Sequence, residues 1–187
     1  GSYTDTGIDK RTTSYAYAKN PLLNILGLPT MERLSNQIGT RIKETQYFYD
    51  TLTLGSVGRG DLTKKSEWVQ SSKYISTGAS YDTLGQKTED RDPRGNITKY
   101  TYDPYNLYPE TSTNALGHKA KYTYDYSSGK ITSVVDPNGF THEQLYDPLD
   151  RVMEVHEPRG QGGALVTVET NIYTDTPRGV SVHNTKY

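Results

Sequence analysis

Two turn signals recur along this sequence with one shared period of about 22 residues. The dipeptide Tyr-Asp occurs five times, and its last four copies are spaced 21, 22 and 22 residues apart, at Tyr81, Tyr102, Tyr124 and Tyr146. A second signal lies halfway between them, as DPRG at Asp92–Gly95, NALG at Asn114–Gly117, DPNG at Asp136–Gly139 and EPRG at Glu157–Gly160. Because two independent markers keep one period, chance is excluded and the chain is predicted to consist of one repeated unit.

The residue types of the two markers predict how each unit folds. Tyr100 and Tyr102 are two residues apart, as are Tyr122 and Tyr124, so each pair projects to one face of a strand. An Asp at the end of a strand bonds the backbone two residues on, and a following Pro fixes φ for the first corner of a turn. Glycine then accommodates a positive φ at the exit. Each unit is therefore predicted as strand, Tyr-Asp turn, strand and Asp-Pro-x-Gly turn, in an antiparallel meander.

The predicted structural residues are the strand tyrosines and the turn residues. They are Tyr49, Asp50, Tyr81, Asp82, Gly85, Asp92, Pro93, Gly95, Tyr100, Tyr102, Asp103, Gly117, Tyr122, Tyr124, Asp125, Gly129, Asp136, Pro137, Gly139, Tyr146, Asp147, Pro158 and Gly160. The tyrosines are expected to pack across strands against residues such as Ile131, Val134, Val152 and Val155.

Composition agrees with an all-β chain of this kind. Only 32% of the residues are hydrophobic, and the mean hydropathy is −0.81, yet the chain holds 17 tyrosines. Disordered chains carry few aromatic residues. Tyrosine combines a large apolar ring with a polar tip, so a Tyr-rich chain can build a thin sheet without an extensive apolar core.

The regularity divides the sequence into three parts. Residues 43–160 are predicted as the repeat region, with regular repeats at 79–160 and a longer hairpin loop at 51–61. Residues 1–42 are predicted as an irregular N-terminal β segment, in which the apolar run Leu22–Leu28 forms a buried strand. Residues 161–187 are predicted as a degenerate or truncated further repeat.

Tandem Tyr-x-Tyr-Asp and Asp-Pro-x-Gly turns at this period resemble the RHS/YD-repeat family, over Lys43 to Gly160. The segments NPLLNILGLPT and RIKETQYFYD resemble the start of the YD-repeat region in Tc insecticidal toxin complexes and their Salmonella-virulence-plasmid relatives. The resemblance implies a β-sheet strip that spirals into a hollow shell around a toxic C-terminal domain. It further implies a larger secreted bacterial toxin, whose shell and enclosed domain are the partners of this segment.

The expected fold is thus an all-β antiparallel meander of tandem β-hairpins, forming a curved open sheet and an arc of a shell. Four regular repeats give about eight strands and the flanks about six more, so the strip is ~65 Å long, whereas enclosing a small domain needs ~110 Å. The family's shell ends in a core motif with an aspartyl autoprotease. DPNGF at Asp136–Phe140 resembles part of that motif, but more repeat follows it, so we expect a turn and no self-cleavage.

Gly1-Ser2 looks like a cloning remnant, which predicts an excised fragment of a longer protein. Excision would leave unpaired strand edges at the N-terminal strand and near Val180–Tyr187. Such edges pair with other chains, so self-association is expected.

Charge and residue counts argue against several other functions. The chain has 21 basic and 22 acidic residues without a basic block, which disfavours nucleic acid. No segment predicts a membrane span, and the lack of cysteine excludes disulfides, thiolate nucleophiles and zinc-thiolate sites. DRDPRGN at 90–96 fails as an EF-hand loop because Arg94 replaces an oxygen ligand. The four histidines have no ligand spacing, so no metal or cofactor is predicted.

Three alternatives remain open. The first is a carbohydrate- or cell-surface-binding module that uses exposed turn tyrosines, Tyr105 and Tyr126. The second is adhesion through Arg59-Gly60-Asp61 in the predicted loop, against the ordinary turn chemistry of Gly-Asp. The third is a glycoside hydrolase that would need paired carboxylates, for which Glu154 and Glu157 are the nearest candidates. His142 and His156 could also face each other across a hairpin.

Overall fold

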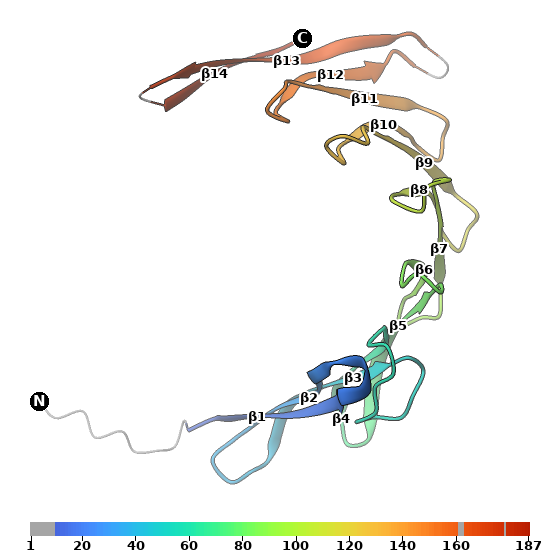
Figure 1. The fold of residues 1–187 in the computed structure, drawn as a ribbon, viewed down its shortest axis with the longest axis vertical. Helices are drawn as coiled ribbons and strands as arrows, with labels where there is room; N and C mark the ends of the chain where they lie inside the picture. The colour runs from blue at the N-terminus through green and yellow to red at the C-terminus, as the bar shows by residue number, and fades with distance from the viewer. Residues whose placement is uncertain (1–9, 161–162, 178) are drawn as a thin grey trace, which may run out of the picture. The chain divides into compact units, whose positions relative to one another are not determined.

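The computed structural model describes residues 10–160, 163–177 and 179–187 (Figure 1). Gly1-Ser2 and the start of the predicted further repeat at 161–162 lie outside these residues. The described residues form fourteen strands and one short 3-10 helix, in the order β1 (Thr12–Asn20), η1 (Pro21–Leu23), β2 (Ile25–Ser35), β3 (Arg41–Tyr49), β4 (Leu62–Gln70), β5 (Lys73–Tyr81), β6 (Lys87–Arg91), β7 (Ile97–Tyr102), β8 (Pro109–Thr113), β9 (Lys119–Tyr124), β10 (Ile131–Val135), β11 (Thr141–Tyr146), β12 (Val152–Pro158), β13 (Leu165–Thr176) and β14 (Gly179–Lys186). Among them no helix has the length and apolar character needed to cross a membrane.

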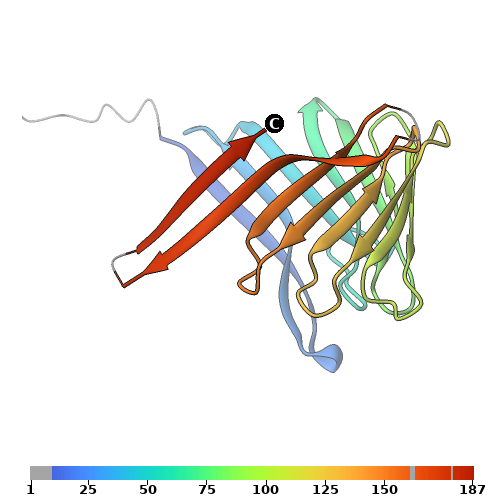
Figure 2. The ribbon, with the colours of Figure 1, turned by 90° about the horizontal axis from the view of Figure 1, so that it is seen from above.

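The strand order in the sheet is the chain order, from β1 to β14. The sheet is open, with β1 and β14 as its outer strands, so the predicted all-β antiparallel meander is confirmed. The chain divides into two compact units, Gly1–Ile97 and Thr98–Tyr187. Within each unit the strands lie side by side, with hairpin turns at both ends (Figure 2). The division of the sequence at 42/43 and 160/161 stays a prediction.

Six hairpin turns share one set of hydrogen bonds. In each turn, the backbone N–H of the first residue donates to the carbonyl of the fifth residue. The N–H of the fourth residue donates to the carbonyl of the first. The side-chain Oδ1 of the first residue also accepts two backbone N–H groups, from the residues two and four positions on. The six first residues are Asn36, Asp82, Asp92, Asn114, Asp136 and Asp147.

This geometry explains the sequence of both turn signals. The fourth residue has a positive φ in all six turns, at Gly39, Gly85, Gly95, Gly117, Gly139 and Asp150. The second residue is Pro in three of them, where the first corner of a type I turn prefers it. Hence the Tyr-Asp turns and the Asp-Pro-x-Gly turns, which look different in sequence, use the same Asx chemistry. Asp103 and Asp125 begin related turns that are one residue longer and close on Tyr108 and Lys130.

The turn predicted at Glu157–Gly160 is wrong in position. Glu157 and Pro158 are the last residues of β12 and pair with β13, and the Arg159 N–H bonds the Ala164 carbonyl. Asp and Asn are the side chains short enough to bond their own backbone two residues on, whereas Glu carries one more methylene. The chain therefore leaves β12 later than predicted, at Gly160, whose φ is +70°.

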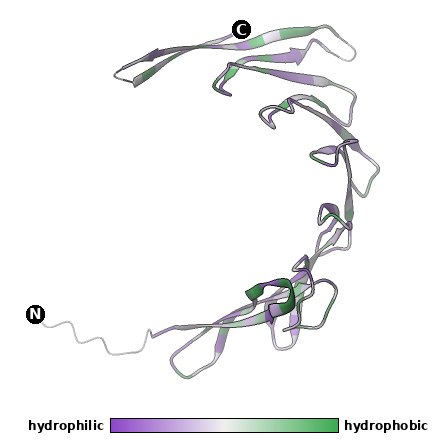
Figure 3. Cartoon of the chain, in the orientation of Figure 1, coloured by the Kyte–Doolittle hydropathy of each residue, from purple (hydrophilic) through white to green (hydrophobic). Residues whose placement is uncertain are grey.

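The buried strand predicted at Leu22–Leu28 is wrong in its first half and in its burial. Leu22 and Leu23 belong to η1 at the tip of the β1–β2 hairpin, followed by Asn24 in the left-handed conformation, whereas Ile25–Leu28 lie in β2. Ile25 and Leu28 are only partly buried, against Ala18, Tyr49 and Val57. The side chains of Leu22 and Leu26 are 95% and 74% exposed, and η1 is the most hydrophobic short segment of the first unit (Figure 3). The predicted loop at 51–61 is confirmed, and it packs Val57 against Ala18 and Tyr49.

Apolar burial contributes little to this fold. Within the described residues the only hydrophobic side chains that are buried are Ala18, Tyr49 and Val57. A single-layer sheet leaves both faces open to water, so cross-strand side-chain pairs have to stabilise it. Buried polar groups accordingly take the place of a core, and they include Thr30, Glu44, Thr45 and Ser66.

Glu44 on β3 is the centre of a polar network whose side chains come from β2, β3 and β5. Its side chain is 1% exposed, and its carboxylate accepts hydrogen bonds from Arg33 (2.6 Å), Arg41 (3.2 Å), Gln46 (2.8 Å) and Tyr74 (2.5 Å). Burial acts to raise the pKa of Glu44, but these donors outweigh it and lower the pKa from 4.5 to about 2. The carboxylate is therefore ionised in the folded chain at neutral pH.

Opposite changes at the fourth residue of two turns, Asp150→Gly and Gly139→Asp, are expected to shift the free energy of unfolding in opposite directions. Asp150→Gly should raise the free energy of unfolding by about 0.5 kcal/mol, because φ at Asp150 is +61° and glycine adopts such values without strain. Gly139→Asp is the matched change, since no atom lies within 4 Å of a Cβ at Gly139 and only its φ of +85° opposes a side chain. It should lower the free energy of unfolding by about 1 kcal/mol in urea denaturation. Equal stability of both variants would contradict this account of the turns.

Acid is expected to destabilise the fold between about pH 4.5 and pH 2. A carboxylate whose pKa is lower in the folded state stabilises the fold above its unfolded pKa, and this contribution is lost as the pH falls through the folded pKa. The pKa of Asp136 and Asp147 is lowered too, since the backbone N–H groups that they accept outweigh their partial desolvation. Urea unfolding at fixed ionic strength over this range measures the effect. Glu44→Gln should lose roughly 2 kcal/mol at neutral pH and depend less on acid, and parallel curves for the two proteins would refute the network.

Candidate functional site: the tyrosine clamps of the repeat

Tyrosine hydroxyls join neighbouring strands at the end of the sheet that carries the Tyr-Asp turns. Tyr81 donates to the carbonyl of Leu62 at 3.1 Å, and Tyr124 donates to that of Pro109 at 3.0 Å. The same bond joins Tyr146 to Ile131, Tyr173 to Val152 and Tyr49 to Pro29, at 2.9, 3.0 and 2.8 Å. We call each of these five hydrogen bonds a tyrosine clamp. Each clamp runs from an odd-numbered strand to the strand that precedes it.

The clamps lie where backbone pairing stops. β10 pairs with β11 from Ser133 to Val135, so Ile131 at the start of β10 has no backbone partner in β11. Likewise β12 pairs with β13 from Glu154 onward, and Val152 lies beyond the last pair. An unpaired carbonyl in a packed sheet is costly, and the tyrosine hydroxyl supplies the missing donor.

The acceptor residue of each clamp also contacts the preceding tyrosine. Ile131 is the register partner of Tyr124, and Val152 is the register partner of Tyr146. Leu62 and Pro109 similarly lie opposite Tyr49 and Tyr102. The residues that begin β4, β8, β10 and β12 therefore each lie between two tyrosines, one opposite in register and one bonded to the carbonyl.

The predicted cross-strand partners of the tyrosines are largely observed. Val134 lies opposite Tyr122, in addition to the pairs at Ile131 and Val152. Val155 instead lies opposite Gln144 and Glu169, so its pairing with a tyrosine was a wrong expectation. The sequence pattern did not predict the hydroxyl bonds, because their acceptors are main-chain carbonyls and leave no mark in the side-chain pattern.

A charged side chain reinforces the clamp at the C-terminal end of the second unit. The Arg151 guanidinium donates to Asp147 of the turn and to Asp175 of β13, and it lies 4.2 Å from the centre of the Tyr173 ring. The hydrogen bonds to Asp175 and Asp147 raise the pKa of Arg151. The turn at Asp147 is thus tied to the strand that carries the next clamp.

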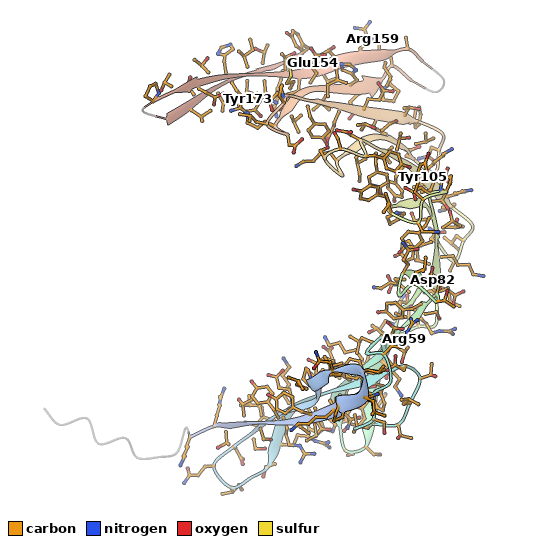
Figure 4. The ribbon with its side chains drawn as sticks, viewed as in Figure 1. Arg59, Asp82, Tyr105, Glu154, Arg159 and Tyr173 are labelled. Carbon is orange, nitrogen blue, oxygen red and sulfur yellow. The ribbon has the colours of Figure 1, made fainter. Side chains whose placement is uncertain are left out.

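The turn tyrosines Tyr105 and Tyr126 form part of an aromatic cluster in the second unit. Their ring centres are 5.5 Å apart, edge to face, while Tyr108 stacks on Tyr124 with ring centres 4.7 Å apart. The side chain of Tyr105 is 70% exposed and that of Tyr126 49%, and Figure 4 shows Tyr105 among the other aromatic side chains. Both rings are accessible, but each also packs against the other.

The Arg59-Gly60-Asp61 triplet is engaged within its own unit. The Arg59 guanidinium donates to the Asp61 carboxylate at 2.5 Å and to the carbonyls of Asp82 and Thr83 (Figure 4). The N–H groups of Gly60 and Asp61 donate to the Asp50 carboxylate. The triplet fastens the 51–61 loop to the neighbouring turn, so an adhesion partner would have to break these bonds.

Glu154 and Glu157, the carboxylates considered for hydrolysis, do not form a pair, and each bonds a histidine of the β11–β12 hairpin. His142 bonds Glu157, whereas His156 bonds Glu154 at 2.8 Å and lies opposite Glu143 in register. His142 and His156 are therefore on opposite faces of the hairpin and do not face each other across it. Glu154 and Glu157 are an odd number of residues apart on β12 and point to opposite faces as well. No metal-binding group of three side chains occurs among the described residues.

Removing one clamp hydroxyl is expected to destabilise the fold measurably. Tyr124→Phe keeps the ring stacked on Tyr108 but leaves the Pro109 carbonyl without its donor, at a cost of about 1 kcal/mol in urea unfolding. Tyr124→Ala also removes the ring and should cost about 3 kcal/mol. Tyr105→Phe, at an exposed ring outside the clamps, is the control and should change stability little. If the two phenylalanine variants are equally stable, the clamps contribute nothing.

No family model matches the chain, and no curated protein matches it. Solved structures do match. The crystal structure of TcdB2-TccC3-Cdc42 aligns with a TM-score of 0.57 at 14% identity, over 94% of this chain and 10% of that chain. The Photorhabdus luminescens Tc holotoxin pore aligns with a TM-score of 0.55 at 15% identity, over 93% of this chain and 10% of that chain. TcdB2-TccC3 aligns with a TM-score of 0.56 at 14% identity, over 94% of this chain and 11% of that chain.

The chain spans about a tenth of the length of the chains it matches. Identity at this level establishes a likeness of fold. This chain therefore has the fold of a segment found in the large chains of Tc toxin complexes.

Proposed function

We propose that this chain is a non-catalytic wall segment of an RHS/YD-repeat shell, which encloses a toxic domain of a larger secreted bacterial protein. The observation that carries the proposal is the series of tyrosine clamps, one for each odd-numbered strand among β3, β5, β9, β11 and β13. These bonds hold a sheet one layer thick without an apolar core. Such construction suits a wall with a space on one side.

The likeness to Tc toxin structures supports the same proposal, since it extends over nearly the whole chain. The outer strands supply the connections that a wall needs. β1 pairs with β2 and β14 pairs with β13, so each has one edge on which further strands of the parent shell can pair. The same edges would support self-association of the isolated segment.

The alternatives find less support. Carbohydrate binding would rely on Tyr105 and Tyr126, whose rings pack against each other, and adhesion would rely on a triplet whose charges are internally paired. The hydrolase alternative was considered at Glu154 and Glu157, and these two carboxylates point to opposite faces of β12.

Protease protection in the full-length gene product tests the proposal. A C-terminal domain enclosed by the shell should resist a protease that digests the same domain when it is expressed alone. Tyr124→Ala with Tyr146→Ala, which removes two adjacent clamps, should open the wall and speed cleavage of that domain at least tenfold. Tyr105→Ala is the matched control and should leave protection intact. If the domain in the unmodified protein is cleaved as fast as the free domain, the wall function is refuted.

A further inference from the structure

A row of four residues crosses strands β3 to β6 on one face of the first unit. Phe48 is the register partner of Lys64, Lys64 of Gly78, and Gly78 of Arg91. Across the row, an aromatic ring is followed by a cationic side chain, then by a glycine without a side chain, and then by a second cationic side chain. Alternate strands are ~9.6 Å apart, so the two cationic side chains flank the gap over Gly78 and are long enough to reach one group placed in it.

A hollow of about 480 Å³ lies over this row. Phe48 and Leu52 give it an apolar end, while Lys64, Arg91 and Glu89 line the rest. Phe48 and Leu52 come from the end of β3 and the loop that follows, so the hollow is built entirely within the first unit. The residues of the two nearest clamps, Tyr49 with Pro29 and Tyr81 with Leu62, do not line this hollow.

The two cations of the hollow have no carboxylate partner. The Lys64 ammonium lies 4.4 Å from the centre of the Phe48 ring, which is its only side-chain interaction among the described residues. Across residues 10–160 and the later described segments, Arg91 forms neither an ion pair nor a side-chain hydrogen bond. By contrast, Arg33, Arg41, Arg59 and Arg151 all bind carboxylates. Against the one carboxylate of the lining, Glu89, these two cations leave the hollow with a net positive charge, which attracts an anion.

The backbone does not require glycine at position 78. Gly78 lies inside β5 and is not among the glycines with positive φ. A Cβ there would meet the Thr63 carbonyl at 3.5 Å and the Arg91 Cβ at 3.6 Å, which are ordinary contact distances. Glycine inside a strand weakens it, and it often marks a place where another molecule approaches the backbone closely. The gap between the two cations is what glycine provides here.

We propose that this hollow binds an acidic peptide segment, with one carboxylate bridging Lys64 and Arg91 over Gly78. The apolar end formed by Phe48 and Leu52 contacts an apolar side chain next to that carboxylate. This combination distinguishes a peptide from a small inorganic anion, which would leave the apolar end uncovered. The site is independent of the shell function proposed above.

Fluorescence anisotropy on the 187-residue chain tests the site with a labelled peptide, Gly-Leu-Glu-Leu-Glu-Gly, at low ionic strength. We expect it to bind at least tenfold more tightly than the matched peptide with glutamine in place of glutamate. The double variant Lys64→Gln with Arg91→Gln should weaken binding at least tenfold. The double variant Lys73→Gln with Arg94→Gln makes the same charge change outside the hollow, and it should bind within twofold of the unmodified chain.

A third variant separates binding from folding. Gly78→Val should raise the midpoint of thermal unfolding, because valine favours strands, and should weaken peptide binding at least tenfold by filling the gap. Several results would overturn the proposal: equal affinity for the two peptides, equal loss in both double variants, or no binding at millimolar peptide. Inorganic phosphate that competes as tightly as the peptide would also overturn it, since the site would then be one for small anions.

Discussion

Hydrogen bonding at strand ends is the interaction on which this structure depends. A sheet of one layer has water on both faces, and only three hydrophobic side chains are buried among the described residues. Backbone hydrogen bonds between strands pair the middle of each strand. The ends of the strands need additional hydrogen bonds to remain attached to their neighbours. At both ends of the strands the Asx turns accept backbone N–H groups on a side-chain oxygen. Beside the Tyr-Asp turns the tyrosine hydroxyls also reach carbonyls that backbone pairing leaves unpaired.

The sequence predicted those parts of the fold that short-range chemistry determines. The turns at Asp82, Asp92 and Asp136 follow from an Asx side chain, a corner and a glycine three residues on, all within five residues. The loop at 51–61 followed from an interruption of the period. The prediction for Leu22–Leu28 failed because it assumed that the whole apolar run enters an interior. The single-layer sheet provides only the small cluster around Val57, which takes Ile25 and Leu28 and leaves the remaining leucines exposed. The turn predicted at Glu157–Gly160 failed because its first residue is Glu. The short side chain of Asp or Asn that accepts the backbone N–H groups of the turn is missing there.

The candidate site was predictable only in part. The spacing of Tyr124 and Tyr146 identified the residues that matter, but their hydrogen-bond acceptors are main-chain atoms of Pro109 and Ile131, which no residue pattern reveals. The network at Glu44 was missed for a related reason. Its donors come from β2, β3 and β5, and only the strand register brings them to one carboxylate.

Each tyrosine clamp points backward along the chain, from a strand to the one made just before it. A hairpin emerging from the ribosome therefore needs no later part of the chain to complete its clamp. It needs only its own second strand, including the tyrosine at the end of that strand. Once that residue has been synthesised, the hairpin is locked and offers a finished edge to its successor. The sheet can also be lengthened by duplication of a gene segment that encodes one repeat. Each new repeat supplies its own tyrosine donor and uses a carbonyl of the preceding repeat as the acceptor.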